Sequence, residues 1–154
     1  MNADIRIAVL DPRWRRALAR TEAVVRQAAA AALEGGAGGP IAIALADDAL
    51  LRELNRDFRG LDKPTNVLSF AASPGAGDVA LAFETCRREA RLQRKSFARH
   101  VRHLVVHGTL HLRGFDHETA ADAFAMEARE RRVLRRLGLP DPYGTRPSAD
   151  RTAA

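Results

Sequence analysis

All five histidines of this 154-residue chain lie within eighteen consecutive residues that end at His117. Apolar residues recur at helical spacing through most of this segment, which predicts a helix over about 97–113. On one face of that helix His107 and His111 stand four residues apart, so their imidazoles can converge on one ion. Gly114 follows where the helix must end. A left-handed glycine there would turn the chain and bring the last histidine to the same point.

This pattern predicts a metal site with three histidine ligands. Its expected cofactor is one Zn²⁺ per chain, held by His107, His111 and His117. Three neutral imidazoles leave the fourth tetrahedral position of zinc for water. The two earlier histidines, His100 and His103, are expected at the surface or behind the ligands rather than among them. The chain has a single cysteine, which excludes an intramolecular disulfide and a cysteine-based zinc cluster.

The segment H-G-T-L-H-L-R-G-F-D-H shares its histidine and glycine spacing with the metzincin proteases. Those enzymes carry a glutamate after the first histidine, which deprotonates the water on the metal, whereas this chain has Gly108. The ligand arrangement is therefore kept without the general base of peptide hydrolysis. The alternative is that the histidines merely flank a buried apolar stripe, but three of them spaced around a glycine favour the metal site.

A second polar cluster precedes an expected buried strand, in L-N-R-D-F-R-G-L-D-K-P-T-N-V-L-S-F from Leu54 to Phe70. Loops on a rigid scaffold are where binding groups concentrate. Arg59 can bind two phosphate oxygens with its guanidinium, and Lys63 can bind phosphate as a point charge. The simpler alternative is an ordinary turn shaped by Pro64.

The expected fold is α+β, in one compact domain over residues 1–143, with a small mixed four-stranded sheet packed with helices and a zincin-like helix that carries the metal site. Alternating or uncharged apolar residues predict strands. They are placed at 5–9, 41–45, 67–70 and 79–83. Helical spacing and caps predict helices at about 13–33, 48–59, 84–93, 97–113 and 119–137. Residues 144–154 lack apolar periodicity and are expected to form a mobile tail.

The net charge is +6 and the isoelectric point is about 10.8, which favours a polyanionic partner. Seven basic residues between Arg87 and Arg102 are opposed only by Glu89, although such a run is most often a solvated helix face. The chain has no apolar run of membrane-spanning length and no signal-peptide pattern. A cytoplasmic protein that does not bind membranes is expected.

The two polar motifs, together with G-D-V at 77–79, K-S-F at 95–97 and L-G-L-P-D-P-Y at 137–143, resemble the YbeY family of bacterial ribosomal RNA maturation factors. The resemblance covers most of the chain from Leu45 to Tyr143. It implies a metal-dependent endoribonuclease with zinc on the three histidines, and an arginine at the position of Arg59 that is important for activity. It also implies single-stranded RNA, rRNA and ribosomal particles as partners.

The resulting hypothesis is a zinc-dependent, single-strand-specific endoribonuclease that acts in small-subunit rRNA 3′ end processing and ribosome quality control. In it, Arg59 stabilises charge that develops on the phosphorus, and Arg59 and Lys63 bind substrate. No residue is assigned as the general base. Asp116 is a candidate, but its carboxylate can equally serve to orient a ligand imidazole. The alternative function is a ribosome-assembly binding factor with a non-catalytic zinc.

Overall fold

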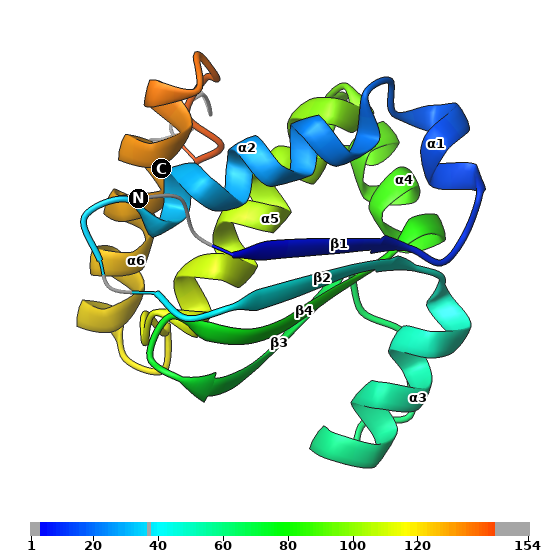
Figure 1. The fold of residues 1–154 in the computed structure, drawn as a ribbon, viewed down its shortest axis with the longest axis horizontal. Coiled ribbons are helices and arrows are strands. Elements are labelled where there is room, and N and C mark those ends of the chain that lie inside the picture. Colours follow the sequence, from blue (N-terminus) through cyan, green and yellow to red (C-terminus); the bar gives the residue numbers. More distant parts are fainter. Residues whose placement is uncertain (1–3, 37, 144–154) are drawn as a thin grey trace.

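Four strands of the described residues, 4–36 and 38–143, form one mixed sheet in the computed structural model (Figure 1). They are β1 (Ile5–Val9), β2 (Ile41–Ala46), β3 (Val67–Ser73) and β4 (Ala76–Ala82), in the order β1-β2-β4-β3. β2 pairs in parallel with β1 and β4, whereas β3 runs antiparallel to β4. The predicted mixed four-stranded sheet is confirmed, and β3 and β4 form a hairpin at its edge.

Six helices accompany the sheet in this described part of the chain. They are α1 (Arg13–Ala17), α2 (Thr21–Leu33), α3 (Asp48–Arg59), α4 (Phe83–Leu92), α5 (Phe97–Leu112) and α6 (Ala120–Arg136). Helices α2 and α5 contact each other over one face of the sheet, and α3 lies on the other side (Figure 1). The predicted α+β class and single compact domain are confirmed.

The main core lies between the sheet and the pair α2 and α5. Side chains at helical spacing on α5 and at alternate positions on the strands are fully buried there, because both sets face the interface. They include Val101, Val105 and Leu110 of α5 and Ile43, Leu45 and Leu81 of the sheet. Helix α5 is thus fixed along most of its length, which gives the histidines near its end a rigid support.

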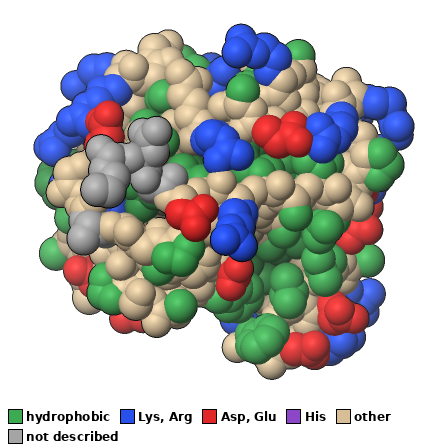
Figure 2. Space-filling model, viewed as in Figure 1, with side chains coloured by type: hydrophobic (Ala, Val, Ile, Leu, Met, Phe, Trp, Pro, Cys, Tyr) green, Lys and Arg blue, Asp and Glu red, His purple; other side chains and the backbone are tan. Residues whose placement is uncertain are grey.

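The other face of the sheet is only partly covered. A groove of about 560 Å³ runs between the strands and α3, lined by apolar side chains that include Leu50, Leu54 and Phe70. Figure 2 shows hydrophobic side chains gathered on this side of the molecule, at the lower right. Phe58 of α3 is 69% exposed beside them.

The prediction of one helix over 13–33 is wrong, since α1 and α2 are separate. The indole of Trp14 is completely buried and donates to the carbonyl oxygen of Ala46 (2.8 Å), which fixes α1 at the end of β2. Leu18 is extended and Arg20 is left-handed, with φ of 56°. Both break the helical path, so that α2 can turn and cross the sheet.

Several strand boundaries also differ from the prediction. Strand β3 continues to Ser73, and β4 begins at Ala76 and ends at Ala82, so that Phe83 belongs to α4. Gly77, expected in a loop, lies within β4 with φ of 145°. A Cβ there would lie 2.1 Å from the carbonyl oxygen of Phe70, so only glycine allows this pairing.

Two further expectations concern the ends of the chain and its surroundings. The predicted mobile tail, 144–154, lies outside the described residues. Among the described helices, none combines the length and the apolar character that crossing a membrane requires.

Candidate metal centre

Helix α5 places two imidazoles side by side. It begins at Ser96, whose hydroxyl accepts from the backbone N–H of Arg99 (3.1 Å), and it is buried along the face opposite the histidines. His107 and His111, one turn apart, have their Nε2 atoms 3.1 Å from each other. Both side chains are half-buried. The predicted pairing on one helix face is therefore present.

The end of α5 turns the chain back as the sequence predicts. Gly114 has φ of 97°, its N–H donates to the carbonyl of His111 (3.0 Å), and the N–H of Phe115 donates to that of Leu110 (3.1 Å). These two bonds form a Schellman motif, the usual way in which a glycine closes a helix. The turn returns the next residues toward α5, and His117 reaches the helix face from there.

Three histidines consequently form a group that can hold a metal ion. The members are His107, His111 and His117, each offering one ring nitrogen, and these nitrogens lie within 4.8 Å of one another. The ring centroid of His117 lies 5.7 Å from that of His107 and 5.1 Å from that of His111. His117 is exposed, so one side of the group is open to solvent. The three residues predicted from the spacing are brought together.

The hydrogen bonds behind two of these rings fix which nitrogen faces the centre. Nδ1 of His107 contacts the carboxylate of Glu130, and Nδ1 of His111 lies 2.9 Å from the carbonyl oxygen of Phe115. Both partners are acceptors, so each Nδ1 carries the proton and each Nε2 keeps a lone pair. Two lone pairs 3.1 Å apart repel each other, and a shared cation removes that repulsion.

The distance between the two Nε2 atoms also fits a shared zinc ion. Two nitrogens that ligate one tetrahedral zinc at about 2.0 to 2.1 Å lie about 3.3 Å apart. The donor set of three neutral imidazoles therefore suits a borderline metal ion better than Mg²⁺ or Ca²⁺, which prefer oxygen.

Glu130, on α6, is the buried partner of this centre. Its side chain has no solvent exposure, and burial alone would raise its pKa. The ring of His103, with Nε2 3.8 Å from the carboxylate, and hydrogen bonds from His107 and from the hydroxyl of Tyr143 (2.5 Å) nevertheless hold the pKa of Glu130 down at about 2. The carboxylate stays ionised at neutral pH and orients the ring of His107.

The environment of His111 favours its neutral form. Burial lowers the pKa of His111, and the neighbouring ring of His107 lowers it further, against an opposing effect of the Phe115 carbonyl. A metal ligand must be unprotonated, so these two effects prepare the side chain for that role.

Gly108 explains why the protease glutamate is missing. This position faces the sheet rather than the histidines, and a Cβ would lie 2.9 Å from Cγ1 of Val79 and 3.2 Å from Cγ2 of Val67. The carbonyl of Gly108 also accepts from the hydroxyl of Ser69 (2.9 Å). Because the helix rests directly on β3 and β4 here, no glutamate fits. The exclusion of metzincin chemistry is thereby supported by packing.

Arg59 and Lys63 line the same cleft as the histidines. The cleft has a volume of about 870 Å³, and its walls come from the end of α3, the loop that follows, β3 and the end of α5. Helix α3 ends at Gly60, with φ of 73°, and the buried amide of Asn55 donates to the carbonyl of Lys63 (2.9 Å). The loop is thus tied to α3, so both basic side chains are held at the rim of the metal centre.

Three other candidate residues lie outside the group of three histidines. His100, expected at the surface or behind the ligands, is only 2% exposed, which excludes the surface position, and its Nε2 lies 2.9 Å from a carboxylate oxygen of Glu89. His103 has its Nε2 3.3 Å from the hydroxyl of Tyr143. The carboxylate of Asp116 accepts from the backbone N–H of His117 (2.7 Å) and so shapes the turn rather than orienting a ligand ring.

Glu130 and Tyr143 were not predicted from the sequence as part of the site. A signal for the first was present, because Met126, Glu130 and Val133 share one face of α6 and a charged residue in an apolar stripe is buried only with a partner. Tyr143 gave no such signal, since it lies beyond the last helix.

Comparisons with known proteins match most of the chain. A sequence model of the family described as Endoribonuclease YbeY matches residues 11–138. An endoribonuclease YbeY of Rhodopseudomonas palustris (strain BisA53) is 52% identical over 144 residues, covering 84% of each chain. One of Paramagnetospirillum magneticum is 48% identical over 158 residues, covering 92% of this chain and 96% of its own.

The fold has a counterpart among solved structures. The solution structure of TM1509 from Thermotoga maritima superposes with a TM-score of 0.55 at 24% identity, covering 92% of this chain and 99% of that one. With the sequence matches over most of the length, the resemblance noted from the motifs is confirmed. The chain therefore belongs to the endoribonuclease YbeY family, a family of enzymes that cleave RNA.

Proposed function

We propose that this protein is a zinc-dependent endoribonuclease that cleaves single-stranded RNA in the cytoplasm. Its substrates are rRNA precursors and ribosomal particles, in small-subunit rRNA 3′ end processing and ribosome quality control. The observation that carries the proposal is the meeting, in one cleft, of three converging imidazoles with Arg59 and Lys63. Nitrogen ligands with an open side, next to phosphate-binding cations, suit hydrolysis of a phosphodiester.

Each residue has a defined part in this proposal. The ligands are His107, His111 and His117, and the ion they hold supplies Lewis acidity and lowers the pKa of a bound water. Glu130 holds the ring of His107 in one orientation and one tautomer. Arg59 binds the scissile phosphate and stabilises the charge that accumulates on its oxygens, while Lys63 binds a phosphate at the rim of the cleft.

The geometry favours an unpaired strand as substrate. The histidines lie between the end of α5 and the loop after α3, in a cleft whose walls include Phe115 and Leu61. Single strands present splayed bases and accessible backbone to such a site, whereas a paired helix presents a broad, rigid surface.

The test compares Arg59→Ala with Arg56→Ala. Arg56 lies one turn earlier on α3, is exposed, pairs with Asp57 and does not line the cleft. Arg59→Ala should keep its zinc and its melting temperature but lose more than tenfold in cleavage of single-stranded RNA, about 1.4 kcal/mol or more of transition-state stabilisation. Arg56→Ala should cleave like the unmodified protein.

The alternative function, a binding factor with a non-catalytic zinc, makes a different prediction. Equal RNA cleavage by the unmodified protein and by zinc-free His111→Ala would disprove the nuclease function and leave the binding factor. Unchanged cleavage in Arg59→Ala would remove only that residue from the mechanism.

A further inference from the structure

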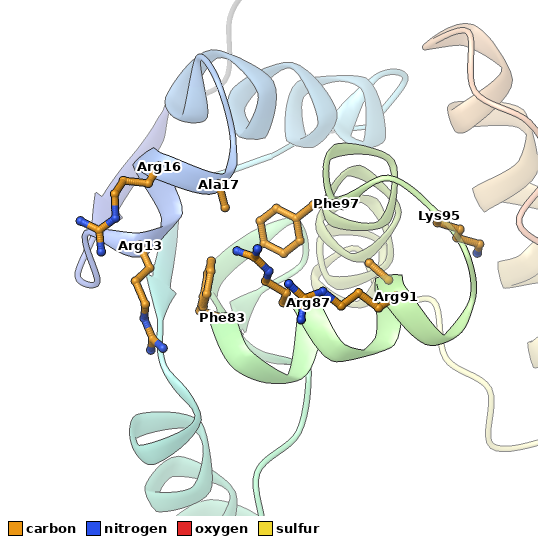
Figure 3. A pocket seen from close by; sticks show the side chains of 9 residues that line it. Arg13, Arg16, Ala17, Phe83, Arg87, Arg91, Lys95 and Phe97 are labelled. Carbon is orange, nitrogen blue, oxygen red and sulfur yellow. The ribbon is translucent and has the colours of Figure 1, made fainter.

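A second cavity, separate from the metal centre, lies between α1 and α4 (Figure 3). It has a volume of about 740 Å³. Basic side chains from α1, α4 and the loop after α4 line it, namely Arg13, Arg16, Arg87, Arg91 and Lys95. Among the described residues, no acidic side chain contributes to the lining. We call it the cationic pocket.

Most of the charge on these walls is uncompensated. Arg13 is neutralised by Asp11 (2.7 Å) and Glu84 (3.2 Å), just outside the lining. The side chains of three other lining arginines make no hydrogen bond or salt bridge with the part of the chain that the structure describes; they are Arg16, Arg87 and Arg91. Several arginines elsewhere on the surface are paired, as in Arg15 with Glu22 (2.7 Å). The pocket therefore gathers three guanidinium groups that form no ion pair with the described residues.

The aromatic floor of the pocket keeps these cations apart and in place. The rings of Phe83 and Phe97 pack with centroids 5.5 Å apart, and Phe97 is partly exposed at the floor. The guanidinium carbons of Arg13 and Arg87 lie 4.7 Å and 5.8 Å from the centroid of Phe83. Guanidinium groups held against a ring lose less freedom on binding phosphate.

Helix α4 is a wall shared by the cationic pocket and the metal-centre cleft. Thr85 and Glu89, one turn apart, line the cleft, whereas Arg87 and Arg91, displaced by two residues, line the pocket. A displacement of two residues is about 200° around a helix, so the two pairs lie on opposite sides. The cavities are thus separated by about the width of one helix, 10–12 Å.

We propose that the cationic pocket binds the phosphate backbone of the RNA strand whose scissile phosphate lies in the metal-centre cleft. This inference rests on the proposed function. The strand crosses α4 between the two cavities. Since a stacked strand advances about 3.4 Å per nucleotide, the crossing takes on the order of four nucleotides.

The arrangement of the arginines favours a strand over a small anion. Arg87 and Arg91 are about 6 Å apart along the axis of α4, and Arg16 lines the pocket from α1, with its guanidinium directed away from α4 in Figure 3. Cations spread in this way contact successive phosphates of a chain. The partly exposed ring of Phe97 between them offers a surface on which a base stacks.

The test measures binding of a fluorescent 20-nucleotide 2′-O-methyl RNA, which resists cleavage, to the zinc-loaded full chain. The variant is Arg87→Glu with Arg91→Glu. The matched control is Arg132→Glu with Arg135→Glu, two exposed positions on α6 that change the net charge by the same amount. The pocket variant should bind at least tenfold more weakly than the control variant.

A salt titration adds a second readout. A contact with one phosphate of a single strand contributes about 0.7 to the slope of log K against log salt, so losing two contacts should reduce the slope by about 1.4. Arg87→Gln with Arg91→Gln, which removes charge without reversing it, should show the same reduction in slope. Circular dichroism melting of each variant establishes that it is folded.

Three outcomes would overturn the inference. Equal affinity of the pocket and control variants would show that only the overall charge matters. An unchanged salt slope would remove the contacts with phosphate. Displacement of the RNA by equimolar pyrophosphate would instead indicate a site for a small phosphorylated ligand.

The proposed function fails differently. If the protein does not cleave unmodified RNA, binding of the 2′-O-methyl strand still reports on the pocket. If the pocket does not bind RNA, cleavage by the unmodified protein still reports on the metal centre.

Discussion

Glu130 on α6 accepts a hydrogen bond from Nδ1 of His107 on α5, and its carboxylate is completely buried. The contact joins residues 23 positions apart and ties the last long helix to the metal centre. The other carboxylate oxygen of Glu130 accepts a hydrogen bond from the hydroxyl of Tyr143 (2.5 Å). A buried carboxylate with several donors is a strong constraint on the ring that it contacts, because leaving either partner unpaired costs free energy.

We therefore predict that Glu130→Gln lowers the affinity for zinc by about 10- to 100-fold, the range found when such supporting groups are removed. The amide has the same shape but lacks the charge that stabilises a metal-bound imidazole. Competition with a chromophoric chelator measures the change. Glu127→Gln, three residues earlier on α6 and half-exposed, should leave the affinity near that of the unmodified protein. An equal loss in the two variants would contradict a specific role for Glu130.

A second prediction follows from the close approach of α5 to the sheet. Gly108→Ala should lower the free energy of unfolding by about 1–3 kcal/mol, as expected for one methyl group forced into a packed interface. The added Cβ would lie 2.9 Å from Val79 and 3.2 Å from Val67, both on strands that cannot easily move. Urea denaturation followed by circular dichroism gives the difference.

Gly36→Ala is the control for that substitution. Its Cβ would also be close to a neighbour, at 2.6 Å, but the neighbour is the flexible end of Arg113. A small change is expected there. If both glycines tolerate alanine equally well, the packing argument at position 108 is wrong.

Local patterns in the sequence predicted that the three histidines meet. His107 and His111 are neighbours on a helix, and Gly114 must turn the chain, so the geometry of this centre depends mainly on a short segment. The strands were predictable for the same reason, since the alternation of apolar and polar residues is a local property of the sequence. The spacing of two between Ile5 and Ile7, for example, indicates their strand from the sequence alone.

Features that depend on distant parts of the chain were not predictable. The break between α1 and α2 exists because Trp14 must reach the end of β2, which helical spacing does not reveal. The place of Glu130 depends on how α6 packs on α5. The cationic pocket joins Arg16 of α1 with Arg91 of α4, and nothing in the basic run of α4 indicates its second wall.

Substitution of single histidines tests the ligand set. His107→Ala, His111→Ala and His117→Ala should each lower the bound zinc per chain, measured by atomic emission after dialysis. His100→Ala should keep its zinc, because the ring contacts Glu89 rather than the group of three. It should nevertheless melt at a lower temperature, because the substitution empties a buried position and removes one of the two hydrogen bonds to Glu89.

Two results would revise that set. Full zinc content in His117→Ala would remove the third ligand. Loss of zinc in His103→Ala comparable to that in His107→Ala would move the site one turn toward the beginning of α5.

The partly buried pair of Glu89 and His100 gives the last prediction, a dependence of stability on pH. Burial raises the pKa of Glu89, but hydrogen bonds from His100 and Asn66 outweigh it and hold the pKa below its ordinary value of 4.5. A carboxyl whose pKa is lower in the folded state stabilises the fold above its unfolded pKa, and this contribution is lost as the pH falls through the folded pKa. The free energy of unfolding of the chelator-treated protein should therefore fall below about pH 4.5, and fall less steeply in Glu89→Gln, which cannot titrate. Glu22→Gln, at an exposed pair with Arg15, should change the slope less because water screens that pair. Parallel pH profiles of the unmodified protein and Glu89→Gln, measured by urea unfolding between pH 7 and 3, would show that the titration of this carboxyl does not contribute to stability.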